Sequence, residues 1–275
     1  MSDFTKQKSL WGTKAYISPN DMMVSRNAFG AGGEGKPRIV LPGSPDTVAI
    51  FDDFLGDTGL MDWTTVNGDT GVAGVGSVVK VTGVGGVLRI TTSADAILTP
   101  VAAIGITTGL QKQWKGNSGN LRMSARVKIG TLAGSELFVG FSDSGGAEMP
   151  AYDTGGGIIT NMADGIGFVY GGNSGTTVWR GISARSVAAD SGDQTATLTS
   201  SPTANVYDVL EVALASDSGE AAKFYVNGKL EGSISQPINA TTALVPVVMA
   251  FASDAAALAF DVDYINVSAS RDTGL

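Results

Sequence analysis

Two acidic residues near the end of the chain have types and spacing that suit acid–base chemistry. Asp261 and Asp263 are separated only by Val262. In an extended strand, residues two apart point to the same side, with Cα atoms about 6.6 Å apart. Two carboxyl groups at such a separation can act together on a glycosidic bond. The stretch also suits the closing strand of a sandwich, and we favour this structural interpretation.

Regular alternation would divide this strand between two faces. One face would carry the two acids together with Ile265 and Val267. The opposite face would carry Phe260, Val262 and Tyr264. A catalytic role would require one of the acids to line a cleft with a raised pKa.

The composition narrows what other chemistry is available. The 275 residues include no cysteine and no histidine. Without cysteine there are no disulfides, thiolate nucleophiles or thiolate metal sites. Without histidine the Ser-His-Asp triad and nearly all zinc sites are excluded. Any reaction must therefore rely on carboxylates, lysine, tyrosine or a hard cation.

Calcium is a hard cation that acidic loops can bind through carboxylate and backbone oxygens. None of the candidate residues belongs to a dense run such as Asp-x-Asp-x-Asp. We therefore favour solvated turn residues over a metal site, and we expect no cofactor. The aspartates in Gly- and Ser-rich loops are Asp52, Asp53, Asp57, Asp143, Asp153 and Asp217.

Exposed aromatic rings often bind sugars, because they stack on the apolar face of a sugar ring. Trp114 is the best candidate, since it lies in the polar stretch QKQWKGNSGN (111–120). Most aromatic residues of a sandwich belong to its core, which is the competing interpretation. The candidates considered are Trp63, Trp114, Tyr152, Tyr170 and Trp179.

From about residue 49 the sequence has the pattern of an antiparallel β protein. Turn-forming clusters separate runs of alternating hydrophobicity. Asn227-Gly228 marks a two-residue hairpin turn, and the apolar run 243–252 suits a strand buried on both faces. A dozen or more strands predict two packed antiparallel sheets. In residues 120–129, one face carries Leu121, Met123, Ala125, Val127 and Ile129.

Residues 1–47 differ from the body, residues 48–275. They are rich in Gly and Pro, and one short helix fits, with Ser18 as N-cap and Gly30 as the stop. Residues 1–45 carry a net charge of +3, against −11 for residues 46–275. Such a segment is either a flexible leader or an extended arm that becomes ordered on a partner, and its large apolar residues favour the arm. The residues of the arm that we expect to bind the partner are Lys6, Lys8, Trp11, Lys14, Tyr16, Met22, Met23, Arg26, Phe29, Lys36 and Arg38.

Charge and hydropathy also exclude classes of partner. An acidic body argues against nucleic acid, since a surface that follows phosphates would be basic. The N-terminal stretch MSDFTKQKSLWG has no apolar core of a secretory signal. The longest apolar run is too short to span a bilayer. We expect neither nucleic acid nor a membrane as a partner.

Four segments resemble, in order and spacing, one known fold. They are IFDDFLGDTGLMDWTTVNG (50–68), DGIGFVYGG (164–172), YDVLEVALASDSGEAAKFYVNGKLEGSI (207–234) and FDVDYINV (260–267). Residues 49–270 thereby resemble the concanavalin A-like jelly roll of laminin-G-type modules, legume lectins and laminarinase-type glycoside hydrolases. The resemblance implies an all-β, antiparallel two-sheet sandwich. Its function must come from its sites, because this fold hosts many functions.

The catalytic signature of the laminarinase-type enzymes, a strand with Glu-x-Asp-x-(x)-Glu, is absent. None of the body's glutamates has an acidic residue two positions away. The metal-ligand set of the legume lectins is absent too. We therefore expect that the protein is not an enzyme. The glutamates considered are Glu136, Glu148, Glu211, Glu220 and Glu231.

A basic arm on an acidic, lectin-like body resembles the organisation of phage head decoration proteins. This resemblance implies a non-catalytic virion structural protein on the capsid exterior, made in the host cytoplasm. Its partners would be major capsid (coat) subunits held by the arm, and the bodies would form a dimer or trimer. The alternative is a glycan-binding module of a tail fibre, spike or other surface protein, with Trp114 as a sugar contact.

Overall fold

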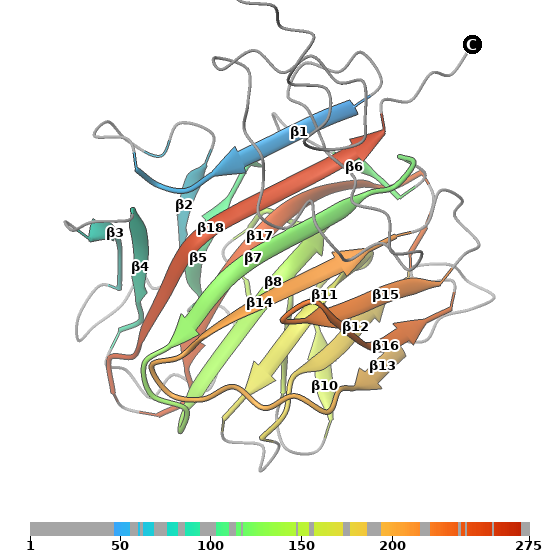
Figure 1. Cartoon of the computed structure of the whole chain (residues 1–275). Helices are drawn as coiled ribbons and strands as arrows, with labels where there is room; N and C mark the ends of the chain where they lie inside the picture. The colour runs from blue at the N-terminus through green and yellow to red at the C-terminus, as the bar shows by residue number, and fades with distance from the viewer. Residues whose placement is uncertain are drawn as a thin grey trace, which may run out of the picture.

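A computed structural model gives the architecture (Figure 1). It describes residues 47–55, 60, 63–68, 76–81, 86–93, 103–109, 114–116, 118–146, 148–153, 157–172, 177–185, 194–214, 221–235, 238–239, 241–254 and 256–270. Within these ranges the elements are β-strands without an α-helix, and their pairings are antiparallel. No helix in the described part of the chain is long and apolar enough to cross a membrane. The predicted all-β class is therefore confirmed.

Sheet A is built around the long last strand. Figure 1 shows β1 beside β18, so strands from both ends of the body lie together. β4 pairs with the first part of β18 and β1 with its last part. The spatial order is β16 (Lys229–Ile234), β15 (Ala222–Val226), β14 (Tyr207–Ala213), β7 (Arg122–Ile129), β18 (Ala259–Ser270), β4 (Val87–Thr91) and β3 (Ser77–Val81), with β1 (Thr47–Asp52) off this path.

Sheet B is the second layer. Its spatial order is β13 (Gln194–Thr197), β12 (Arg180–Ala184), β11 (Gly165–Gly171), β8 (Ser135–Ser142), β17 (Ala243–Ala252), β5 (Ile104–Thr107) and β2 (Thr64–Asn67), with β6 (Trp114–Lys115) paired to β17. A separate two-stranded sheet joins β9 (Ala151–Asp153) to β10 (Ile158–Thr160). The predicted pair of antiparallel sheets is therefore present, and each sheet buries one face against the other.

The main core lies between the two sheets. Phe168 meets Trp179 and Phe224 edge to face, with ring centroids 6.5 and 5.3 Å apart. Aromatic pairs favour this geometry, and burial of one such ring contributes about 2–3 kcal/mol. The alternation predicted for β7 is confirmed, because Leu121, Met123, Ala125, Val127 and Ile129 are all buried in this core.

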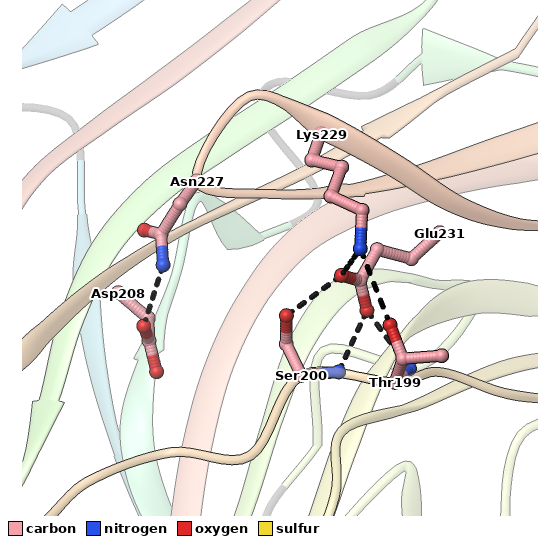
Figure 2. Close-up of polar contacts among 6 residues, drawn as sticks. All are labelled: Thr199, Ser200, Asp208, Asn227, Lys229 and Glu231. Atoms are coloured by element: carbon pink, nitrogen blue, oxygen red, sulfur yellow. Dashed lines mark hydrogen bonds and ion pairs between the residues drawn. The ribbon is translucent and has the colours of Figure 1, made fainter.

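The hairpin between β15 and β16 is tied to the neighbouring chain segments (Figure 2). Asn227 and Gly228 have φ angles of 52° and 81°, which confirms the predicted turn. The Asn227 side chain accepts a hydrogen bond from the Val209 N–H and donates one to Asp208. Asp208 also accepts from the indole N–H of Trp179, so the turn is joined to the core.

Glu231 in β16 forms the second tie (Figure 2). Its carboxylate accepts hydrogen bonds from the backbone N–H groups of Thr199 and Ser200 and from the Ser200 hydroxyl. Lys229 adds an ion pair at 3.1 Å. Burial acts to raise the pKa of Glu231, but the hydrogen bonds lower it to about 2. This cluster is satisfied internally, which suits a structural clamp.

Candidate functional site

The face of sheet A that points away from the core carries many ionisable side chains. β7 supplies Arg122, Ser124, Arg126 and Lys128 to this face, as the sequence predicted, because their neighbours in the strand are buried. We call this face the outer platform. Its charged and aromatic members are Phe51, Arg89, Arg122, Arg126, Lys128, Tyr207, Glu211, Lys223, Tyr225, Asp261, Asp263 and Tyr264.

A β-bulge in β18 decides which residues reach the platform. Val262 pairs with Val127, but the next pairing joins Tyr264 to Arg126, so Asp263 is an extra residue. Val262 before the bulge and Ile265 after it are both buried in the core. The bulge thus reverses the alternation. The prediction that Ile265 and Val267 share the acids' face is wrong, and Tyr264 joins the acids instead.

Each of the two acids has its own cationic partner. Asp261 accepts hydrogen bonds from Arg89 Nε at 2.7 Å and Nη2 at 2.9 Å, and Lys128 Nζ lies 2.8 Å away. Asp263 is paired with Arg126. Burial acts to raise the pKa of Asp261, but Arg89 and Lys128 lower it overall. Asp261 is therefore held as a carboxylate, which agrees with the structural interpretation of this pair and not with a general acid.

Aromatic rings flank the Arg126–Asp263 pair. The Arg126 guanidinium lies 4.2 Å from the Tyr207 ring centroid, and Lys128 Nζ lies 5.0 Å from it. On the other side, Tyr264 is paired with Arg126 across the strands and stacks on Phe51 with centroids 6.0 Å apart. All three rings are half-buried. The platform therefore combines ring faces with planar hydrogen-bonding groups.

A second cluster of ionisable residues lies on the far side of sheet B. Glu136 stands between Gly171 and Phe251 in the sheet and accepts a hydrogen bond from the Asp153 N–H at 3.2 Å. Asp153 forms an ion pair with Arg180 at 2.9 Å. Burial raises the pKa of Glu136 to about 9, although the hydrogen bond from the Asp153 N–H acts to lower it; the charge of Asp153 makes a smaller contribution to the rise. Glu136 is therefore a neutral acid at pH 7.

Glu136 and Asp153 are 17 residues apart and lie on different strands, so no short sequence motif contains both. The sequence analysis considered Glu136 only for an acidic residue two positions away. Gly171 leaves the room that the pair needs. A Cβ atom at Gly171 would lie 2.4 Å from the Asp153 Cβ and 2.8 Å from Glu136 Oε2.

The same face of sheet B is apolar and covered. Phe138, Val169 and Met249 on the sheet pack with Met149 and Ala151 on the segment that carries β9. Tyr152 of β9 meets Phe251 edge to face at 5.6 Å. Glu136 beneath this cover is only 1% exposed, and Asp153, which belongs to β9 itself, is 3% exposed. A ligand would reach them only if the cover moved.

The aromatic residues proposed for sugar stacking are mostly core residues. Trp114 is 5% exposed, and it lies in β6, where it pairs with Leu244 of β17. The prediction of Trp114 as an exposed sugar contact is therefore wrong, because its ring belongs to the main hydrophobic core. Trp63, Tyr170 and Trp179 are buried as well.

The other predicted binding and metal-ligand residues have different outcomes. The partner-binding residues predicted between Lys6 and Arg38 lie outside the described residues, and so do Asp57 and Asp217. Among the residues that the structure describes, no group of three or more acidic side chains could hold a metal ion. Asp52, by contrast, accepts a hydrogen bond from the Phe54 N–H, as a turn residue does.

No model of a known protein family matches the sequence, and no curated protein matches it. Solved structures share the fold. A laminarinase from Rhodothermus marinus has a TM-score of 0.55 at 14% identity, over 82% of this chain and 98% of that one. An endo-β-1,3(4)-glucanase of family GH16 has a TM-score of 0.54 at 13% identity, over 83% of this chain and 93% of that one. A Crh5 transglycosylase has a TM-score of 0.51 at 10% identity, over 80% of this chain and 83% of that one. The sandwich is thus a concanavalin A-like jelly roll, as the resemblance implied.

The same comparison corrects two expectations. The expectation that the protein is not an enzyme is contradicted, because these similar structures are glycoside hydrolases and a transglycosylase. The missing Glu-x-Asp-x-(x)-Glu strand excludes only acids placed on one strand, whereas Glu136 and Asp153 meet from two strands. The capsid decoration role receives no support from these comparisons. That role was inferred from the organisation of the chain and not from a site.

Proposed function

We propose that this protein is a glycan-binding jelly roll whose sugar site is the outer platform. The observation that carries the proposal is the arrangement of Phe51, Tyr264 and Tyr207 around Arg126 on one sheet face. Binding sites for small polar ligands combine apolar ring surface with a few fixed polar groups that set orientation. The platform supplies both from four adjacent strands.

The polar groups of the platform are oriented before any ligand arrives. Arg126 uses one guanidinium nitrogen on Asp263, and Arg89 uses two on Asp261. An arginine has five N–H donors, so each keeps donors for another acceptor. Both side chains are about 40% exposed. Side chains held in place lose less entropy on binding, which favours affinity.

The fold comparisons make β-glucan the first ligand to test, because glucan hydrolases share this jelly roll. Binding is measured by affinity electrophoresis in gels that contain a neutral or an acidic polysaccharide, and on a glycan array. Tyr207→Ala removes a ring and should weaken binding about tenfold, since one ring contact contributes about 1–2 kcal/mol. Tyr207→Phe keeps the ring and is the matched control.

The result has a clear reading in each direction. Retention of binding in Tyr207→Phe together with its loss in Tyr207→Ala supports the site, provided that both variants keep their melting temperature. Full binding by Tyr207→Ala would place the ligand elsewhere. Absence of binding to every glycan would refute the proposal itself.

One observation favours a second candidate function, glycan cleavage. A neutral acid beside an ion-paired carboxylate, as in Glu136 and Asp153, resembles an acid–base pair whose environments differ. The enclosure of both groups makes this the second candidate. The test is release of reducing ends from the bound polysaccharides. Glu136→Gln should abolish the release and leave binding unchanged, and equal release by the variant excludes Glu136.

A further inference from the structure

The outer platform has a charge opposite to that of the whole chain. Among its described members, five are cations and three are carboxylates, which leaves an excess of two positive charges. The complete chain has a net charge of −8. The cations are Arg89, Arg122, Arg126, Lys128 and Lys223, and the carboxylates are Glu211, Asp261 and Asp263.

The two excess positive charges lie at different places on the sheet. Asp261 is shared by Arg89 and Lys128, so one carboxylate faces two cations. Lys223 lies at the other end of the platform, opposite Ala213 of β14, and its side chain is exposed. The positive excess on this face favours an anionic ligand there, although the complete chain is acidic.

The shape of the donors indicates which anion fits. A guanidinium presents parallel N–H donors that match the two oxygens of a carboxylate. Arg89 already makes this forked contact with Asp261. Arg126, 40% exposed and lying over the Tyr207 ring, can present its remaining donors to a carboxylate on a stacked sugar.

We infer that the glycan bound on the outer platform contains uronic acid units, whose carboxylates accept from Arg126 and lie within the field of Lys128 and Lys223. This inference rests on the proposed function and narrows its ligand to an acidic polysaccharide. The sugar rings contact Tyr207 and Tyr264, and the carboxylates supply the preference over neutral glucan.

The test uses the full chain and two forms of one polymer, polygalacturonate and its carboxyl-reduced, neutral derivative. We expect about tenfold tighter binding to polygalacturonate in low salt, and a decline of that preference at high salt as the Debye length shortens. Lys223→Glu reverses a platform charge and should weaken binding about fivefold. Lys115→Glu makes the same change at an exposed lysine of β6, off the platform, and should change binding less than twofold.

The outcomes separate the inference from the proposed function. Equal affinity for the two polymers overturns the inference and leaves glycan binding in place. Binding to neither polymer and to no other glycan overturns both. Equal effects of Lys223→Glu and Lys115→Glu show attraction by net charge alone and overturn the platform as the acidic site. Binding to dextran sulfate without binding to polygalacturonate overturns the choice of carboxylate.

Discussion

Replacement of Glu136 by glutamine should stabilise the protein at neutral pH. Glutamine has nearly the shape of glutamic acid, and its amide oxygen can accept the hydrogen bond that Glu136 receives from the Asp153 N–H. It cannot ionise. The variant therefore removes the ionisation of one buried group and leaves the packing around Gly171 and Phe251 almost unchanged.

The magnitude follows from the pKa of about 9 in the folded state against 4.5 in the unfolded chain. Between these values the unfolded state releases the Glu136 proton and the folded state keeps it, so the free energy of unfolding falls as pH rises. Each pH unit changes it by about 1.4 kcal/mol. At pH 7, about 2.5 pH units above the unfolded-state pKa, the wild type has lost about 3 kcal/mol of its free energy of unfolding. The Glu136→Gln variant does not lose this stability.

The assay is urea denaturation of both proteins at several pH values between 4.5 and 9. The two stabilities should be similar near pH 4.5 and diverge steadily above it, with the variant more stable. Glu148→Gln, at an exposed glutamate, is the control for loss of one surface carboxylate. Parallel curves for wild type and Glu136→Gln would refute the reasoning, because Glu136 would then ionise equally in both states.

Three other predictions concern ties elsewhere in the sandwich. Asp261→Asn should cost about 1–2 kcal/mol at pH 7 in thermal melts, since it leaves Arg89 and Lys128 facing each other; no loss would mean that solvent screens the pairs completely. Glu231→Gln should cost about 1 kcal/mol at pH 7, after allowance for solvent. Because the folded pKa is about 2, this difference should vanish in melts as pH falls from about 4.5 toward 2, and a constant difference would contradict the ionic cause. Asn227→Ala should cost about 1–2 kcal/mol in urea, because alanine disfavours positive φ and lacks the two side-chain hydrogen bonds. Asn227→Gly keeps the turn geometry and should cost less, so the reverse order would contradict this account.

Much of the fold could be predicted from the sequence, because the signals are local. The alternation of Leu121 to Ile129 fixes which face of β7 is buried. Asn227-Gly228 places a hairpin, since both residues tolerate positive φ. The apolar run of β17 predicts a strand buried on both faces, and nine of its ten residues are buried. In each case neighbouring residues carry the information.

The candidate sites depended on contacts between distant strands. The extra residue at Asp263 leaves no mark in the sequence, yet it moves Tyr264 onto the outer platform and Ile265 into the core. Burial raises the pKa of Glu136, and this burial depends on the packing of the β9 segment against sheet B. The polar neighbours of Trp114 suggest an exposed loop, but β6 pairs with β17 and Trp114 is buried. The strands and their turns follow from the sequence alone, because their causes lie within a few residues. Burial, charge pairing and the register of β18 were decided by the tertiary structure, because they depend on which strands become neighbours.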